Sequence, residues 1–174
     1  MRVYGSATEA GRGAAVSTQI NTLFEERAEA ALRRCCASAD WTRQMMGARP
    51  FSGWEDLMEK ADRIWWSLDA ASWREAFAAH PRIGERRPEE AWASEEQSGV
   101  VASSSTVTTA LFEANRVYEK RFGHIYIVCA SGRSGEEMLA LAEERLKNAP
   151  ADELRIGAEE QRKITRLRLL KLVS

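Results

Sequence analysis

The sequence is poor in the residues that build disulfide and metal sites. It has three cysteines and two histidines in 174 residues. Cys35 and Cys36 are adjacent and Cys129 lies far away, so this odd number excludes a disulfide framework and favours free thiols in a reducing compartment. No C-x-x-C pair and no H-E-x-x-H motif is present, and the sequence therefore gives no reason to expect zinc.

Net charge and long apolar runs are lacking as well. The 25 basic and 26 acidic residues leave a formal charge of -1, which predicts neither nucleic acid nor a membrane as partner. No apolar run approaches the roughly 20 residues that span a bilayer, and the N-terminus has no signal-peptide core. The last residues, Lys171 to Ser174, do not form a peroxisomal Ser-Lys-Leu signal, so we expect a cytoplasmic protein.

Helical patterning is what the sequence has in quantity. Its composition is 44% hydrophobic and 29% charged, as in an ordinary globular protein, and 174 residues suffice for one domain with a sizeable core. Residues 1–19 carry no sustained apolar period and are expected to form a loose N-terminal arm. Residues 20–174 predict an all-α, single-domain bundle of about seven or eight helices with little or no sheet.

Local signals mark where these helices begin and end. Capping-box patterns begin at Thr22, Ser52, Ser72 and Ser134, each with a glutamate three residues later. Together with proline and glycine stops and apolar periodicity, they predict helices at about 22–38, 41–48, 52–68, 72–80, 107–122, 134–148 and 151–172, and a further helix that begins at Pro88.

Two stretches leave alternatives open. Trp54 and Trp65 lie on the apolar stripe of the helix predicted at 52–68, where they could form a ligand cage, but their helical period favours core packing. The run 124–130 is the only one with a local preference for strand. Since no second strand is available to pair with it, it is either an extended connection or a buried helix segment.

His80 is the first candidate functional residue. Together with Trp73 and Phe77 it follows the apolar face of a predicted helix, and Pro81 should end that helix near His80. An imidazole placed there can move protons in both directions near neutral pH. The alternative is a structural histidine that caps the helix and interacts favourably with its dipole.

Two charged residues have similar alternatives. Glu96 shares a helical face with Trp92 and Ala93, so its carboxylate is either solvated surface charge or an inward group with a raised pKa. Arg168 is flanked by leucines in the last predicted helix, and it is either an amphipathic edge residue or the cation of a buried pocket.

Six motifs, in order, make the sequence resemble a known family. They are Arg49-Pro50-Phe51, His80-Pro81-Arg82-Ile83-Gly84, Glu96-Gln97, Asn115 with Tyr118 and Arg121-Phe122-Gly123, the run to Cys129-Ala130 with Gly132-Arg133-Ser134, and Lys163-Ile164 with Arg166-Leu167-Arg168-Leu169. From about residue 20 onward, the chain resembles the 2-oxo-4-hydroxy-4-carboxy-5-ureidoimidazoline (OHCU) decarboxylases of urate breakdown. The resemblance implies an all-helical homodimer that converts OHCU to (S)-allantoin without metal or organic cofactor.

The resemblance also assigns residues to the site. His80 is then the principal catalytic residue, with Glu96 as its acidic partner and Arg168 as a cation that anchors the substrate. The substrate-binding set comprises Pro81, Gln97, Arg168 and the backbone of Ile125, Tyr126, Ile127 and Val128. One departure from the family pattern is Ala93, which stands where the family often has serine, with Ser94 one residue later.

This residue set suits decarboxylation because the substrate has its own electron sink, a carbon–nitrogen double bond beside the carbon that loses carbon dioxide. As a hypothesis, His80 takes or polarises the hydroxyl proton, Glu96 fixes the tautomer of His80 or donates the stereospecific proton, and Arg168 holds a carboxylate or carbonyl oxygen. Two other functions remain open: a hydrolase of the same pathway, and a helical interaction module without catalytic activity.

Overall fold

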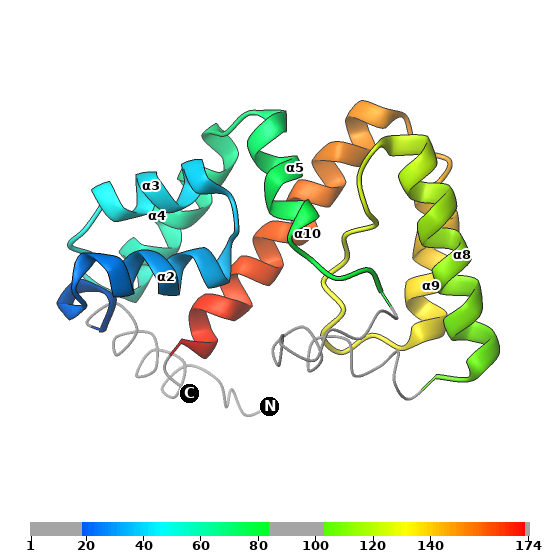
Figure 1. Ribbon diagram of the computed structural model, residues 1–174, viewed down its shortest axis with the longest axis horizontal. Coiled ribbons are helices and arrows are strands. Elements are labelled where there is room, and N and C mark those ends of the chain that lie inside the picture. Colours follow the sequence, from blue (N-terminus) through cyan, green and yellow to red (C-terminus); the bar gives the residue numbers. More distant parts are fainter. Residues whose placement is uncertain (1–18, 84–102, 173–174) are drawn as a thin grey trace, which may run out of the picture. The chain divides into compact units, whose positions relative to one another are not determined.

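All regular secondary structure in the described part of the chain is helical. The computed structural model describes residues 19–83 and 103–172, and within these ranges it contains no strand. One helical turn at 19–22 precedes α2 (Glu25–Cys35), α3 (Ala39–Gly47), α4 (Trp54–Ser67), α5 (Ala70–Ala78), α8 (Ser105–Phe122), α9 (Gly135–Arg145) and α10 (Pro150–Lys171) (Figure 1). The predicted all-α fold is confirmed.

Several predictions fall outside the described residues. These are the helix predicted at Pro88, both Glu96 and Gln97, and most of the N-terminal arm. The chain divides into two compact units, one formed by residues up to Glu75 together with those from Arg162 onward, the other by Ala76–Gln161. The predicted division into an arm and one domain stays a prediction.

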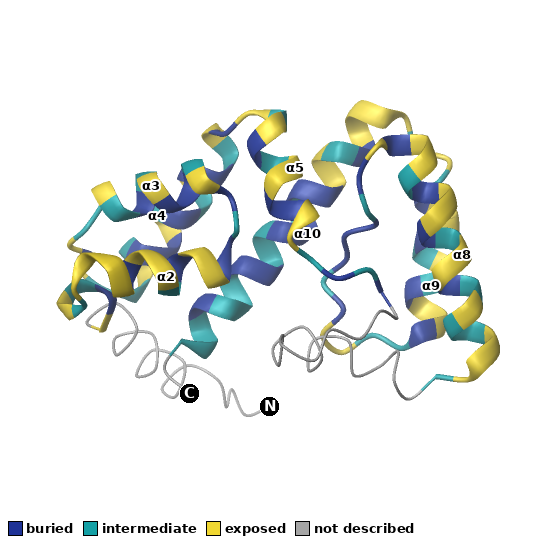
Figure 2. Cartoon of the chain, in the orientation of Figure 1, coloured by how far each residue is buried: buried dark blue, intermediate teal, exposed yellow. Residues whose placement is uncertain are grey.

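The first unit is built on the packing of α2, α3 and α4. Their amphipathic faces bury large side chains, among them Leu32, Trp41, Met45, Leu57 and Trp65 (Figure 2). The indole N–H of Trp41 donates to the carbonyl oxygen of Ala61 on α4 at 3.1 Å, which satisfies its polar group inside the core. Trp65 is buried in this core and Trp54 is half-buried, so for Trp65 the prediction of core packing is confirmed.

The motif Arg49-Pro50-Phe51 closes this unit. The guanidinium of Arg49 donates to the carbonyl oxygens of Asn21 and Leu23 at 3.1 and 2.8 Å. The Asn21 side chain pairs with both backbone groups of Phe51, donating at 2.7 Å and accepting at 2.8 Å. These contacts tie the chain before α2 to the α3–α4 connection, so the described contacts of this part of the family signature are structural.

Three of the four predicted capping boxes are wrong. Thr22 does not cap a helix, because α2 begins at Glu25 without a side-chain cap, and α4 likewise follows Gly53 with no cap from Ser52. Ser72 lies inside α5, and its amide donates instead to the carboxylate of Asp69 at 2.8 Å, which caps the helix three residues earlier than predicted. The box at Ser134 is confirmed with both of its hydrogen bonds.

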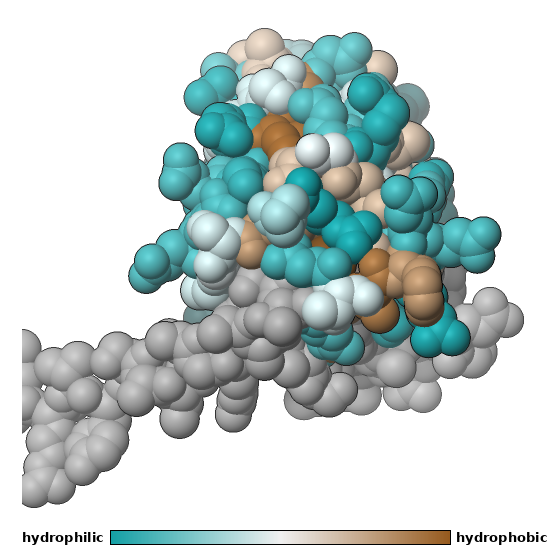
Figure 3. Space-filling model, turned by 90° about the vertical axis from the view of Figure 1, so that its left-hand side faces the viewer, coloured by the Kyte–Doolittle hydropathy of each residue, from teal (hydrophilic) through white to brown (hydrophobic). Residues whose placement is uncertain are grey.

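The described surface of the first unit is mostly hydrophilic. Figure 3 shows small, separate apolar areas among polar side chains on the side that carries α2 and α3. Phe24, which immediately precedes α2, is an apolar residue with 85% exposure. Single apolar side chains of this kind are normal on a folded protein. No helix in the described ranges is both long and apolar enough to cross a membrane.

Burial should protect the thiol of Cys36 from chemical modification. Burial raises its pKa to about 12, against the weaker opposing effect of hydrogen bonds from Ser38 and Thr165. At pH 8 the reactive thiolate is then about one part in ten thousand. We expect iodoacetamide to leave Cys36 unmodified in the native protein and to modify it fully in denaturant, as read by peptide mass spectrometry. The half-buried Cys129 provides an internal comparison, and rapid native-state alkylation of Cys36 would contradict the prediction.

The second unit is organised around two helices that run in the same direction. Helices α8 and α9 lie side by side, and residues 124–134 lead the chain back from the end of α8 to the start of α9 (Figure 1). Gly123 ends α8 at φ 73°, a left-handed conformation that favours glycine. The core beneath contains Ile83, Leu111, Tyr118, Phe122, Tyr126, Val128, Ala130, Met138 and Ala142. Of the two alternatives for residues 124–130, the extended connection is confirmed.

Candidate active site

His80 lies just beyond α5, which ends at Ala78, two residues earlier than predicted. Its backbone N–H still donates to the carbonyl oxygen of Phe77 at 3.0 Å, so the last turn holds its position. The imidazole is half-buried, and its Nε2 lies 2.7 Å from the side-chain oxygen of Gln161 on α10. The structure thus gives His80 a buried polar partner that the sequence analysis did not identify.

The residues after His80 anchor it from the other side. Pro81 is buried, and Ile83 belongs to the core of the second unit. Between them, Arg82 makes a two-pronged ion pair with Glu119 on α8, with N–O distances of 2.6 and 3.0 Å. Because the paired geometry of guanidinium and carboxylate fixes orientation, these contacts hold the backbone that carries the imidazole.

The extended segment 124–130 is held by polar side chains instead of a neighbouring strand. The Asn115 side-chain oxygen accepts from the amide of Tyr126 at 3.3 Å, and the Glu160 carboxylate accepts from the amide of Cys129 at 2.8 Å. Between them, the Arg145 guanidinium donates to the carbonyl oxygen of Ile127 at 2.8 Å. Three helices therefore supply the partners that a β-sheet would otherwise provide.

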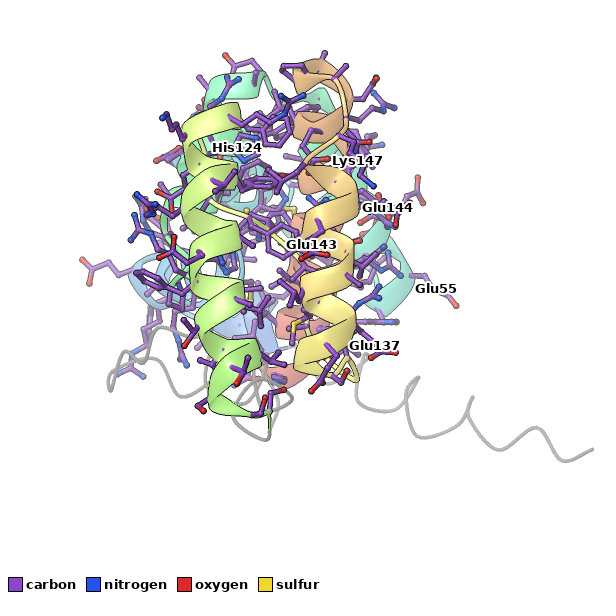
Figure 4. The ribbon with its side chains drawn as sticks, turned by 90° about the vertical axis from the view of Figure 1, so that its right-hand side faces the viewer. Glu55, His124, Glu137, Glu143, Glu144 and Lys147 are labelled. Atoms are coloured by element: carbon purple, nitrogen blue, oxygen red, sulfur yellow. The ribbon has the colours of Figure 1, made fainter. Side chains whose placement is uncertain are left out.

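Helix α10 brings His80 and the extended segment to the same place. The neighbouring residues Glu160 and Gln161 bind Cys129 and His80, respectively. One turn earlier, α10 approaches closely at Gly157, where an added Cβ would lie 3.2 Å from the Phe77 ring. That ring in turn contacts His124, which starts the extended segment at the end of α8 (Figure 4).

A buried ion pair supports this arrangement. The carboxylate of Glu153 accepts hydrogen bonds from Arg145, Tyr118 and Asn148, at 2.8 Å from Arg145 and 2.7 Å from Asn148. The side chains of Arg145 and Glu153 are 8% and 0% exposed. Burial disfavours the charge of Arg145, but the neighbouring Tyr118 and Glu153 raise its pKa, so the guanidinium stays charged. Burial also raises the pKa of Tyr118, which remains a neutral donor.

The other predicted site residues lie in different parts of the chain. Tyr126, Ile127 and Val128 are buried in the extended segment and Ile125 is half-buried. Arg168 is half-buried in the first unit, where its guanidinium lies 3.4 Å from the carbonyl oxygen of Arg34. Glu96 and Gln97 lie outside the described residues. Their assignment, like that of Arg168, stays a prediction.

Two residues of the site were missed by sequence reasoning, namely Glu160 and Gln161. Both are buried although they are polar. A sequence signal was available, because Glu153 and Glu160 are seven residues apart and therefore lie on the same face of α10. Buried polar residues are rarely without a specific partner. In the described ranges no group of three or more histidine, cysteine or acidic side chains could hold a metal ion.

Comparisons with known proteins identify relatives of this chain. The chain is 39% identical over 152 residues to the uric acid degradation bifunctional protein TTL of Arabidopsis thaliana, covering 80% of this chain but only 45% of that protein. It is 29% identical over 167 residues to the OHCU decarboxylase of Amia calva, covering 89% and 93% of the two chains. The chain thus spans less than half of the plant protein and nearly all of the fish protein.

Two solved structures are similar in fold. A crystal structure of an OHCU decarboxylase in the presence of (S)-allantoin matches with a TM-score of 0.72 and 41% identity, over 81% of this chain and 95% of that one. An (S)-allantoin synthase matches with a TM-score of 0.66 and 15% identity, over 89% and 53% of the two chains, which shows the fold alone. The family model for OHCU decarboxylase matches residues 21–170, and the chain belongs to the OHCU decarboxylase family.

Proposed function

We propose that this protein decarboxylates OHCU to (S)-allantoin in urate degradation. The family membership and the 41% identity to a decarboxylase studied with (S)-allantoin support this reaction. The structural observation that carries it is the placement of His80. Its imidazole is half-buried just beyond the end of α5 and contacts Gln161 on α10. The neighbouring residue of α10, Glu160, binds the extended segment at Cys129. Proton transfer by a positioned histidine is the chemistry that this decarboxylation needs.

The reaction can be written with the substrate as its own electron sink. The bond between the ring carbon and the carboxylate breaks, carbon dioxide leaves, and the electron pair moves toward the adjacent carbon–nitrogen double bond, whose nitrogen takes up a proton. The hydroxyl on the same ring carbon gives up its proton and becomes a carbonyl group. The neighbouring carbon, which carries the ureido group, then receives a proton on one face, and this fixes the product as the S enantiomer.

The protein groups in this proposal divide the work of proton transfer and substrate binding. His80 takes the hydroxyl proton, and Glu96 donates the stereospecific proton or helps to fix the imidazole. Arg168 anchors a carboxylate or a carbonyl oxygen. Pro81, Gln97 and the backbone of residues 125–128 complete the substrate-binding set. The position of the substrate then depends on the contacts that fix the extended segment.

The setting of the reaction is part of the same proposal. The family resemblance implies a homodimer that uses neither metal nor organic cofactor. A chain of balanced charge, with no long apolar run, suits a cytoplasmic location. The partner of the site is then a small anionic ureide.

Product stereochemistry and carbon dioxide release test the function together. We expect rapid growth of a single-enantiomer circular dichroism signal when urate is oxidised in the presence of a hydroxyisourate hydrolase and this protein. Without this protein, the same mixture should form allantoin slowly and as a racemate. Released carbon dioxide, measured in parallel, separates a decarboxylase from a pathway hydrolase, which releases none. A slow racemic product in both mixtures would overturn the proposal.

A further inference from the structure

The contact between His80 and Gln161 points to one tautomer of the imidazole. Nε2 of His80 lies 2.7 Å from Oε1 of Gln161, a normal hydrogen-bond distance. The glutamine oxygen can only accept, so the hydrogen of this bond belongs to Nε2. A neutral imidazole in this tautomer has its lone pair on Nδ1.

Gln161 is well placed to impose this choice. It is fully buried, at 0% exposure, which restricts rotation of its amide. Just before it along α10, Glu160 binds the amide of Cys129, and Gly157 lets the helix approach Phe77 closely. These contacts fix the helix against both the end of α5 and the extended segment. The amide oxygen therefore meets an imidazole whose own backbone is already held.

We propose that Gln161 is a positioning residue that fixes His80 as the Nε2–H tautomer for its part in proton transfer. The part that His80 plays in proton transfer rests on the proposed function, whereas the tautomer itself does not. A neutral amide suits this task because it directs the ring without adding a charge beside it. A carboxylate in the same place would favour the charged imidazolium, which has no lone pair to accept a proton.

Nitrogen NMR of the full-length protein tests the tautomer directly. In histidine-labelled protein above the titration range of the imidazole, we expect the Nε2 signal of His80 to be of the protonated type and the Nδ1 signal of the unprotonated type. The variant His80→Asn assigns the signals, because the sequence has only one other histidine. The opposite pattern would mean that the amide nitrogen of Gln161 faces the ring, and it would overturn the proposal.

Two substitutions of Gln161 link the tautomer to the rate. Gln161→Met keeps the volume but removes the acceptor, so we expect a mixed tautomer and a kcat lowered by roughly tenfold or more with KM little changed. Gln161→Glu keeps an acceptor but adds charge, so the Nε2–H tautomer should persist while the acid limb of the pH profile moves to higher pH. Gln44→Met on α3 is the matched control, with an expected wild-type kcat.

The outcomes separate the two proposals. A wild-type tautomer and wild-type kcat in Gln161→Met would overturn the role of Gln161, even if decarboxylation is confirmed. Absence of decarboxylation in the wild type would overturn the proposed function, while the NMR pattern would still decide the tautomer. Circular dichroism spectra of each variant establish that it is folded, and Gln161→Glu together with the wild-type spectrum keeps the test decisive if Gln161→Met does not fold.

Discussion

His80→Asn is expected to lower kcat for (S)-allantoin formation by about a hundredfold to ten-thousandfold, because the protein then loses its proton-transfer group. Asparagine is similar in size and its amide can still hydrogen-bond to Gln161, so the packing at the end of α5 should be kept. The coupled urate assay measures the effect as loss of the single-enantiomer circular dichroism signal. Allantoin should still form by the uncatalysed route, as a racemate.

The matched control for this prediction is Arg116→Gln on the exposed side of α8. Arg116 pairs only with Glu113 of its own helix among the described contacts, and both side chains are more than half exposed, at 73% and 55%. Such a surface pair contributes little, so wild-type rate and enantiomeric excess are expected. If His80→Asn also kept both, His80 would not be the proton-transfer group and the proposed mechanism would be wrong.

Local sequence signals predicted the elements of the second unit well. The apolar period of α8, its glycine stop at Gly123 and the capping box at Ser134 are each determined by residues within one or two turns. The boxes at Thr22 and Ser72 failed although their pattern is the same. At Ser72 the competing group was Asp69, an equally good cap three residues earlier, and the sequence pattern alone did not rank the two.

The candidate site was predictable only in part. The helical period and the following proline predicted the end of α5 to within two residues, because both are local signals. Its partner Gln161 lies 81 residues further along the chain, and no local period connects the two. Contacts of this kind depend on how helices pack, which a single sequence does not encode in any short window.

The extended segment illustrates the same limit. Its β-branched and aromatic residues gave a correct local preference for extended backbone, and the lack of a second strand was recognised. The sequence could not show how its backbone groups are satisfied. Asn115, Arg145 and Glu160 come from three different helices, and each binds a different residue of the segment. A single side chain can thus be required both for stability and for the position of the proposed binding segment.

Arg145→Met is expected to lower the free energy of unfolding by about 3–5 kcal/mol, because it leaves the buried Glu153 carboxylate without its cation. Folded domains are stable by only about 5–15 kcal/mol, so this is a large share of the total. The carbonyl oxygen of Ile127 also loses its donor, and a weaker substrate interaction should follow. Urea denaturation followed by far-ultraviolet circular dichroism measures the stability, and the coupled assay measures KM.

Two further variants separate a lost ion pair from a lost arginine. Arg116→Met removes a guanidinium from the exposed pair on α8, and its expected cost is below about 1 kcal/mol. The double variant Arg145→Met with Glu153→Gln removes both charges while keeping an amide that can bind Tyr118 and Asn148, so it should be more stable than Arg145→Met alone. Equal losses in Arg145→Met and Arg116→Met would mean that the buried pair does not hold this unit together. If the double variant is no more stable than Arg145→Met, removing the uncompensated charge of Glu153 has restored no stability. The loss would then come from the packing of the Arg145 side chain and its hydrogen bond to Ile127.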